Sequence, residues 1–357
     1  MDRLLPFHRY ILLWLGMGLV GLLTACSALP GASAATPLQA TATPWGPFYT
    51  HPSHTFALPV PAGWQVVAED EVSVRLEPLP PDTDKRWVEM TATFTGIPLS
   101  PDALKTFARR FAADSCPAAQ GCEVHRARES SDGEVAVGMR YVAPQGEELH
   151  LRFTFRQAEA VVYSLTAAST GRGVLRDFQH ALWQQAQLHP EQASNLPLYG
   201  AHHPYALPLH AIAAETGPYV VVEVPKGWGL SRVDEVEEEA YYAYALAASP
   251  DGVFALGLYT GHPPGLSPAT VPQVATAQLQ SLFHIDALRI EHQEVDAEGR
   301  WLLTWQAKAP NIQAVTLAAL HENELVLITG VAPTELWPLA AARFHEIVTS
   351  YRLAPTP

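Results

Sequence analysis

Three cysteines, Cys26, Cys116 and Cys122, are the side chains of this sequence best suited to covalent chemistry. A thiol can carry a lipid, form a disulfide, bind a metal or act as a nucleophile. Cys26 directly follows residues 11–25, an uncharged apolar stretch of 15 residues that comes after Arg3 and Arg9. Because a membrane span needs about 20 apolar residues, this stretch is too short to span and instead fits the core of a signal peptide.

The stretch ends in Leu23-Thr24-Ala25-Cys26, which resembles the bacterial lipobox. The resemblance implies that residues 1–25 are a lipoprotein signal peptide. Cys26 would then carry a thioether-linked diacylglycerol with fatty acids such as palmitate, and would become the mature N-terminus. We therefore expect a lipid anchor that holds the chain on the extracytoplasmic face of the cell membrane. Cleavage after Ala32-Ser33-Ala34, or no cleavage, are alternatives that also export the chain.

Cys116 and Cys122 lie in the segment Ser-Cys-Pro-Ala-Ala-Gln-Gly-Cys. Outside the cytoplasm thiols are oxidised, and acylation of Cys26 leaves these two as the available pair. We predict a disulfide between them. The spacing is not Cys-x-x-Cys, so a redox-active pair is less favoured.

Histidines and acidic residues are candidates for metal binding. His51 and His54 lie at the start of the first predicted domain, and His202 and His203 lie in the predicted linker between the domains. A run of acidic residues comprises Asp234, Glu235, Glu237, Glu238 and Glu239. A metal site needs three or four converging ligands, which these scattered residues do not indicate. Solvated side chains are the simpler interpretation, and we predict no metal site.

No cofactor or catalytic site is predicted. The sequence contains no Gly-x-Ser-x-Gly, His-Glu-x-x-His or Gly-rich phosphate loop, so we expect no enzyme. Gly16-x-Gly18-x-x-Gly21 lies inside the signal peptide and lacks the βα context of a dinucleotide site. A net charge of −14 argues against nucleic acid and against electrostatic adhesion to anionic lipid.

The chain after Cys26 is organised by an internal repeat. Residues 26–50 are rich in Ala, Thr, Ser, Pro and Gly and predict a flexible tether. Val60-Pro61-Ala62-Gly63-Trp64 recurs as Val224-Pro225-Lys226-Gly227-Trp228, and the turn Asp132-Gly133 recurs as Glu298-Gly299. We predict domains at 51–190 and 215–354, joined by a linker at 191–214.

Each predicted domain combines strands with helices. Val135, Val137 and Met139 alternate with polar or small residues, which is typical of a half-buried strand. Ser100-Pro101 and Ser267-Pro268 each begin an apolar-periodic segment, which indicates a helix. Short connections between the strands favour antiparallel pairing. The expected fold class is therefore α+β, in two tandem copies of an antiparallel sheet covered by helices.

The Pro-x-Gly-Trp turn, the strands, the Ser-Pro helix start and the closing helix resemble the PsbP/DcrB-like superfamily. The resemblance implies a curved antiparallel sheet in extracytoplasmic proteins that bind or assist other proteins. We expect a non-enzymatic binding or accessory module with a protein partner in the cell envelope. The alternatives are an extracytoplasmic hydrolase acting on envelope material and a carrier of a small ligand or metal. Trp64 and Trp228 are expected to pack inside the fold.

Overall fold

The computed structural model describes residues 45–81, 83–117, 121–143, 146–171, 175–209, 218–237 and 240–355. The predicted signal peptide, Cys26 and most of the predicted tether lie outside these ranges. Residues 43–357 form one compact unit. No helix in the described ranges is long and apolar enough to cross a membrane.

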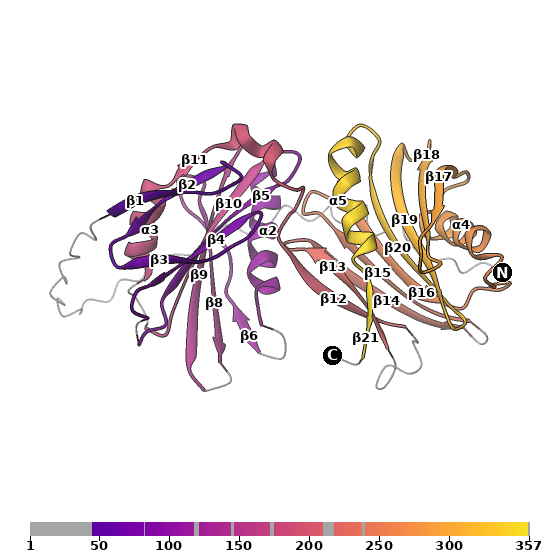
Figure 1. Cartoon of the computed structure of the whole chain (residues 1–357), viewed down its shortest axis with the longest axis horizontal. Helices are drawn as coiled ribbons and strands as arrows, with labels where there is room; N and C mark the ends of the chain where they lie inside the picture. The colour runs from indigo at the N-terminus through magenta and orange to yellow at the C-terminus, as the bar shows by residue number, and fades with distance from the viewer. Residues whose placement is uncertain are drawn as a thin grey trace, which may run out of the picture. The chain divides into compact units, whose positions relative to one another are not determined.

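The first half of this unit contains a small sheet and a large sheet (Figure 1). The small sheet has the order β1-β2-β11 and the large one the order β3-β4-β5-β10-β9-β8-β6, with β7 also paired to β8. Every pair of named strands is antiparallel. The elements are β1 (Trp45–Thr50), β2 (Phe56–Pro61), β3 (Trp64–Glu69), β4 (Ser73–Pro78), β5 (Trp87–Phe94), α2 (Pro101–Asp114), β6 (Cys122–Val124), β7 (Arg128–Glu129), β8 (Val135–Val142), β9 (Glu148–Ala158), β10 (Val161–Ser169), α3 (Leu175–Gln185), β11 (Gln187–Leu188) and the 3₁₀-helix η1 (Pro190–Asn195).

The second half repeats this order of elements. Its small sheet is β12-β13-β21 and its large sheet is β14-β15-β16-β20-β19-β18-β17. The elements are β12 (His202–Pro208), β13 (Tyr219–Pro225), β14 (Gly229–Glu237), β15 (Ala240–Ala248), β16 (Ala255–Gly261), α4 (Val271–Leu282), β17 (Arg289–Val295), β18 (Trp301–Ala307), β19 (Ile312–His321), β20 (Glu324–Pro333), α5 (Trp337–Thr349) and β21 (Arg352–Ala354).

The repeated Val-Pro-x-Gly-Trp sequence forms the same turn in both halves. It joins β2 to β3 and β13 to β14. Gly63 has φ +79° and Gly227 has φ +85°, a left-handed conformation that glycine adopts without strain. The turn therefore explains why glycine recurs at this position.

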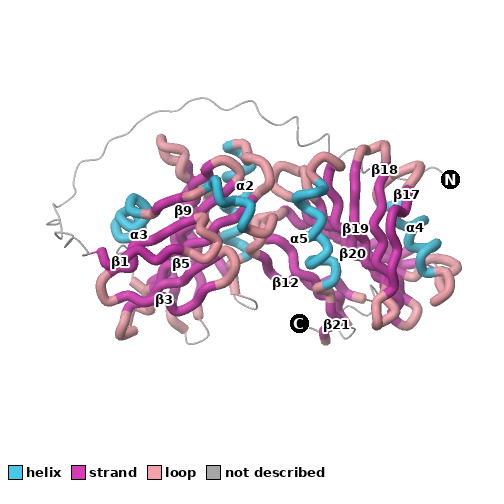
Figure 2. Tube along the Cα trace, turned by 45° about the horizontal axis from the view of Figure 1, so that its top comes forward, coloured by secondary structure: helices cyan, strands magenta, loops and turns pink. Residues whose placement is uncertain are grey.

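The predicted α+β fold class is wrong, because the chain is mainly antiparallel β-structure. Seven strands spaced about 4.8 Å apart make a sheet about 30 Å wide, whereas a helix is only about 10 Å across. Single helices of 11–14 residues therefore cannot cover these sheets. Figure 2 shows the helices as short separate segments beside long strands.

Part of this excess of strands comes from segments that the sequence analysis assigned to connections. β1 lies within the predicted tether 26–50, and β12 lies within the predicted linker 191–214. Each pairs with the strand that precedes the Pro-x-Gly-Trp turn. Regular structure therefore begins earlier in each half than the composition indicates.

Several local predictions are confirmed. Ser100 is the N-cap of α2, and its side chain accepts a hydrogen bond from the Ala103 amide. Val135, Val137 and Met139 on β8 are buried as their alternation predicts. The helix predicted to begin at Ser267 instead begins at Val271, because Ser267 and Thr270 form a hydrogen-bonded turn ahead of it.

Helices α2 and α3 pack on opposite faces of the first large sheet. Phe107 and Phe111 of α2 share a core cluster with Phe153 and Phe155 of β9. Trp183 of α3 belongs to a different cluster, with residues of β4, β5 and β10. Side chains alternate along a strand, so Arg152, Thr154 and Arg156, which alternate with the two phenylalanines of β9, face the α3 side. On that side α3 contacts β10, leaving β8 and part of β9 accessible.

Candidate anion-binding groove

A groove lies on the α3 side of β8, in the part of the sheet that α3 does not cover. It encloses about 370 Å³. Ala136 and Gly138 form its floor; they are two positions apart on β8 and therefore share a face. Their small side groups leave a trough along the strand.

Strand register places basic side chains on both sides of this trough. Arg152 of β9 is the cross-strand neighbour of Gly138. On the other side of β8, Arg128 of β7 is the neighbour of Ala136. Arg126 also lines the groove. Three guanidinium groups from separate segments therefore line one trough.

His125 lies directly against Gly138. Its backbone amide donates to the Gly138 carbonyl at 2.8 Å. A Cβ atom placed on Gly138 would be 2.9 Å from Cδ2 of the imidazole, which is closer than carbon atoms pack. Glycine at position 138 therefore allows the His125 ring to rest on the sheet and line the groove.

The acidic residues near the groove are held by other cations. At one end Arg140 binds Glu123, which also lies 3.7 Å from His125. At the other end Arg156 and Glu134 form an ion pair at 3.1 Å. Both carboxylates are therefore bound by arginines that do not line the trough.

The side chains of the three lining arginines have no hydrogen-bond or ion-pair partner in the described part of the chain. Arg126 and Arg128 are exposed and Arg152 is half-buried. Burial lowers the pKa of Arg152, as does the nearby Arg176, whereas Glu134 raises it. Arginine remains charged despite such a shift, so the groove holds positive charge that Glu134 offsets only in part.

The second large sheet has different residues at the matching positions. Counted from the turns Asp132-Gly133 and Glu298-Gly299, Leu302 and Thr304 of β18 replace Ala136 and Gly138. The cross-strand neighbour of Leu302 on β17 is Glu294, and that of Thr304 on β19 is the buried Val315. The fold therefore does not require the basic trough, which is a property of the first sheet.

The predicted disulfide between Cys116 and Cys122 is present, with a Cα–Cα distance of 6.0 Å. It connects the chain just after α2 to the first residue of β6. Cys116 and Cys122 both pack against the core beneath α2. The bridge thus holds the segment that leads into His125 and Arg126.

The histidines considered as metal ligands have structural partners instead. His51 is buried, its Nε2 donates to the Asp70 carbonyl at 3.0 Å and its Nδ1 lies 2.7 Å from Ser53 Oγ. Burial lowers the pKa of His51. His54 is exposed in the turn that follows. Within the described ranges no three His, Cys, Asp or Glu side chains converge as metal ligands.

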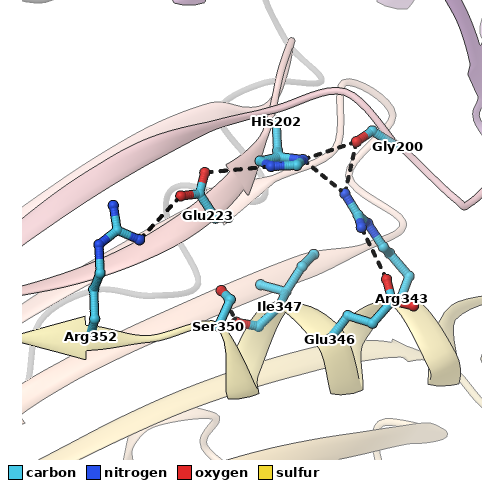
Figure 3. A network of polar contacts seen from close by, with 8 residues as sticks. All are labelled: Gly200, His202, Glu223, Arg343, Glu346, Ile347, Ser350 and Arg352. Carbon is cyan, nitrogen blue, oxygen red and sulfur yellow. Dashed lines mark hydrogen bonds and ion pairs between the residues drawn. The ribbon is translucent and has the colours of Figure 1, made fainter. Parts of the chain in front are cut away.

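His202 belongs to a polar network that fastens α5 to the small sheet (Figure 3). Its Nδ1 lies 3.2 Å from Arg343 Nη2, which also donates to the Gly200 carbonyl at 2.8 Å. Its Nε2 lies 3.7 Å from Glu223, which also binds Arg352 of β21. The network connects β12, β13, α5 and β21 rather than presenting ligands to a metal.

His203 lies at a buried contact between the two halves. Its Nδ1 is 3.9 Å from Asp114 at the end of α2. Asp114 accepts a hydrogen bond from the Gly227 amide at 2.7 Å, and Lys226 Nζ lies 3.5 Å from Ser115 Oγ. Burial lowers the pKa values of His203 and Lys226 and raises that of Asp114. This cluster joins the end of α2 to the second Pro-x-Gly-Trp turn.

Both repeated tryptophans pack against aromatic residues of the fold, although Trp64 is only partly buried. Trp64 stacks on Phe178 of α3 with ring centroids 5.0 Å apart. Trp228 is buried and meets Tyr199 edge-on at 5.2 Å.

The acidic run lies partly on a strand. Residues 234, 235 and 237 lie on β14, whereas Glu238 and Glu239 lie outside the described residues.

The groove itself was missed by sequence reasoning. Its residues come from positions 125, 126, 128, 136–138 and 152, which only the register of three strands brings together. The sequence did contain an indication of the groove. Arg152 and Arg156 occupy polar positions of β9, and the same face of β8 carries the small residues Ala136 and Gly138.

No protein-family model and no curated protein matches this chain. Among solved structures, the chain is similar to cyanobacterial PsbP (CyanoP) from Synechocystis sp. PCC 6803, with 14% identity and a TM-score of 0.29, over 44% of this chain and 98% of that protein. It is also similar to a protein from Bacteroides thetaiotaomicron VPI-5482, with 11% identity and a TM-score of 0.30, over 46% of this chain. That match spans 54% of the Bacteroides protein.

Proposed function

We propose that this chain is a non-enzymatic binding module of the cell envelope that holds an anionic ligand in the groove of its first large sheet. The observation that carries the proposal is a trough lined by three arginines whose side chains have no hydrogen-bond or ion-pair partner among the described residues, in a chain of net charge −14. Guanidinium groups bind oxyanions through charge-assisted hydrogen bonds, often two at a time.

The proposal combines the predicted binding module with the small-ligand alternative. Arginine side chains that line the same trough repel one another. A bound anion is attracted by each of them and also reduces this repulsion. The half-buried position of Arg152 strengthens this attraction, because charges are screened less away from bulk water.

Location in the envelope is a second part of the proposal. The lipobox-like sequence ending in Cys26 supports a lipid anchor on the extracytoplasmic face, and the anionic ligand would then belong to the envelope or to an envelope partner. Cells grown with radioactive palmitate test the anchor. The wild-type chain should be labelled and Cys26→Ala should not; label on the variant, or an unlabelled wild type, would refute the anchor.

Anion binding is tested by isothermal titration calorimetry of the full-length protein in detergent at low salt, with phenyl phosphate as the probe. Arg152→Gln should weaken binding about tenfold or more, the loss expected for a hydrogen bond to a charged group. Arg289→Gln changes the net charge equally, at an exposed position on β17 of the other large sheet, and should leave binding unchanged. Equal losses in both variants would show that the net charge, rather than the groove, attracts the anion.

A further inference from the structure

The charge and shape of the groove indicate a ligand class more specific than anions in general, an inference that rests on the proposed function. The seven lining residues include three arginines and no carboxylate. The nearby Glu129 is already bound by Lys105 at 2.6 Å. A ligand with one negative charge would leave two of the guanidinium charges uncompensated, whereas a dianion balances the groove more fully.

The positions of the arginines favour a group that accepts hydrogen bonds from two opposite sides. Arg128 and Arg152 lie on the strands that flank β8, so their backbones are separated by two strand spacings, about 10 Å, across the sheet and by two residues, about 7 Å, along it. Both side chains can turn inward over the small residues Ala136 and Gly138. A terminal phosphate presents three free oxygens around its axis and can bind both arginines at once. A carboxylate or a phosphate diester has only two free oxygens.

The size of the groove favours an organic phosphate over the bare ion. A volume of about 370 Å³ falls within the range of small-molecule pockets, which starts at about 300 Å³. The floor, formed by Ala136 and by the His125 ring that rests on Gly138, offers a surface for the carbon atoms of the ligand.

We infer that the groove binds the terminal phosphate of a phosphate monoester, with Arg152 on one side and Arg128 and Arg126 on the other. The monoester can be a soluble metabolite or a lipid headgroup, since both present the same dianionic phosphate.

The inference is tested by calorimetry with four ligands that share a phenyl group: phenyl phosphate, phenyl sulfate, methyl phenyl phosphate and benzoate. Measurements at pH 8 keep the monoester doubly charged, because its second pKa is about 6. Phenyl phosphate should bind at least tenfold more tightly than the other three and more tightly than inorganic phosphate.

Two variants connect this preference to the groove. Arg128→Gln removes an exposed side chain from the rim, so folding should be preserved while phenyl phosphate affinity falls about tenfold. Ala136→Leu fills the floor and should reduce binding of phenyl phosphate more than binding of inorganic phosphate. Circular dichroism melting curves establish that both variants are folded.

The outcomes separate this inference from the proposed function. If the sulfate, the diester or inorganic phosphate binds as tightly as phenyl phosphate, the monoester inference is overturned while anion binding stands. If none of the anions binds, both are overturned. Co-sedimentation with vesicles of phosphatidic acid, against phosphatidylglycerol vesicles as a diester control, then identifies the source. Retention that requires Arg128 indicates a lipid-borne monoester, and its absence indicates a soluble one.

Discussion

Replacing Gly227 with alanine tests whether the second Pro-x-Gly-Trp turn is packed against the first half of the chain. A Cβ atom at this position would lie 2.4 Å from Cδ2 of Phe107 on α2, far inside contact distance. The turn cannot easily move, because the Gly227 amide donates to Asp114 and Phe107 is fully buried. The added methyl group therefore overpacks a core that includes residues of both halves.

Gly63 provides a matched control, since it occupies the same turn in the first half. Its φ of +79° is close to the +85° of Gly227, so alanine incurs a similar backbone strain of about 1–2 kcal/mol at either site. The nearest atom to a Cβ on Gly63 is the Leu79 carbonyl oxygen, at 3.9 Å, which is an ordinary contact. Overpacking adds about 1–3 kcal/mol at Gly227 alone.

The free energy of unfolding is measured by urea denaturation of the full-length protein in detergent, followed by far-ultraviolet circular dichroism. Gly63→Ala should lower it by about 1–2 kcal/mol and Gly227→Ala by about 2–5 kcal/mol, which sums the strain and overpacking terms. The difference between the two variants measures the contact with Phe107. Equal losses would refute the reasoning, because they would show that the backbone conformation alone determines the cost.

Two further predictions concern the disulfide and a buried histidine. Replacing both Cys116 and Cys122 with serine should lower the free energy of unfolding by about 2 kcal/mol, the loop-entropy value for so short a bridge. In reducing buffer the wild type and the variant should unfold at nearly the same urea concentration. A difference in midpoint that persists there would show that side-chain packing, rather than the bridge, causes the loss. Because burial lowers the pKa of His51, the unfolded chain binds more protons near pH 6, so this residue contributes stability above about pH 6.5 that is lost as the pH falls. His51→Gln should therefore reduce the loss of stability between pH 7 and pH 5; an unchanged pH slope in this variant would contradict the assignment.

Local patterns in the sequence predict the elements whose stability is local. The alternation along β8 and β9 follows from a sheet with one buried face, and Ser100 caps α2 with its own side chain. The glycines of the repeated turn reflect a backbone conformation that needs no distant partner.

The fold class depended on pairing between strands that are far apart in the sequence, which local residue patterns do not predict. β1, β11, β12 and β21 are short or proline-containing, and composition alone assigns such segments to connections. They are strands because β2 and β13 offer edges to pair with. A strand needs a partner for its hydrogen bonds, and that partner can be more than a hundred residues away, as β21 is from β13.

The sequence by itself predicted the lipobox-like leader, the disulfide between Cys116 and Cys122 and the recurrence of one turn. Each of these features depends on residues that are close together in the chain. Tertiary structure decided that the two copies differ: among the described residues, the first sheet alone places arginines on both sides of a trough, and the second turn alone packs against Phe107. The physical reason is register. Which side chains become neighbours across strands is set by the hydrogen-bonded alignment of distant segments, and a shift of one residue would move each of them to the opposite face.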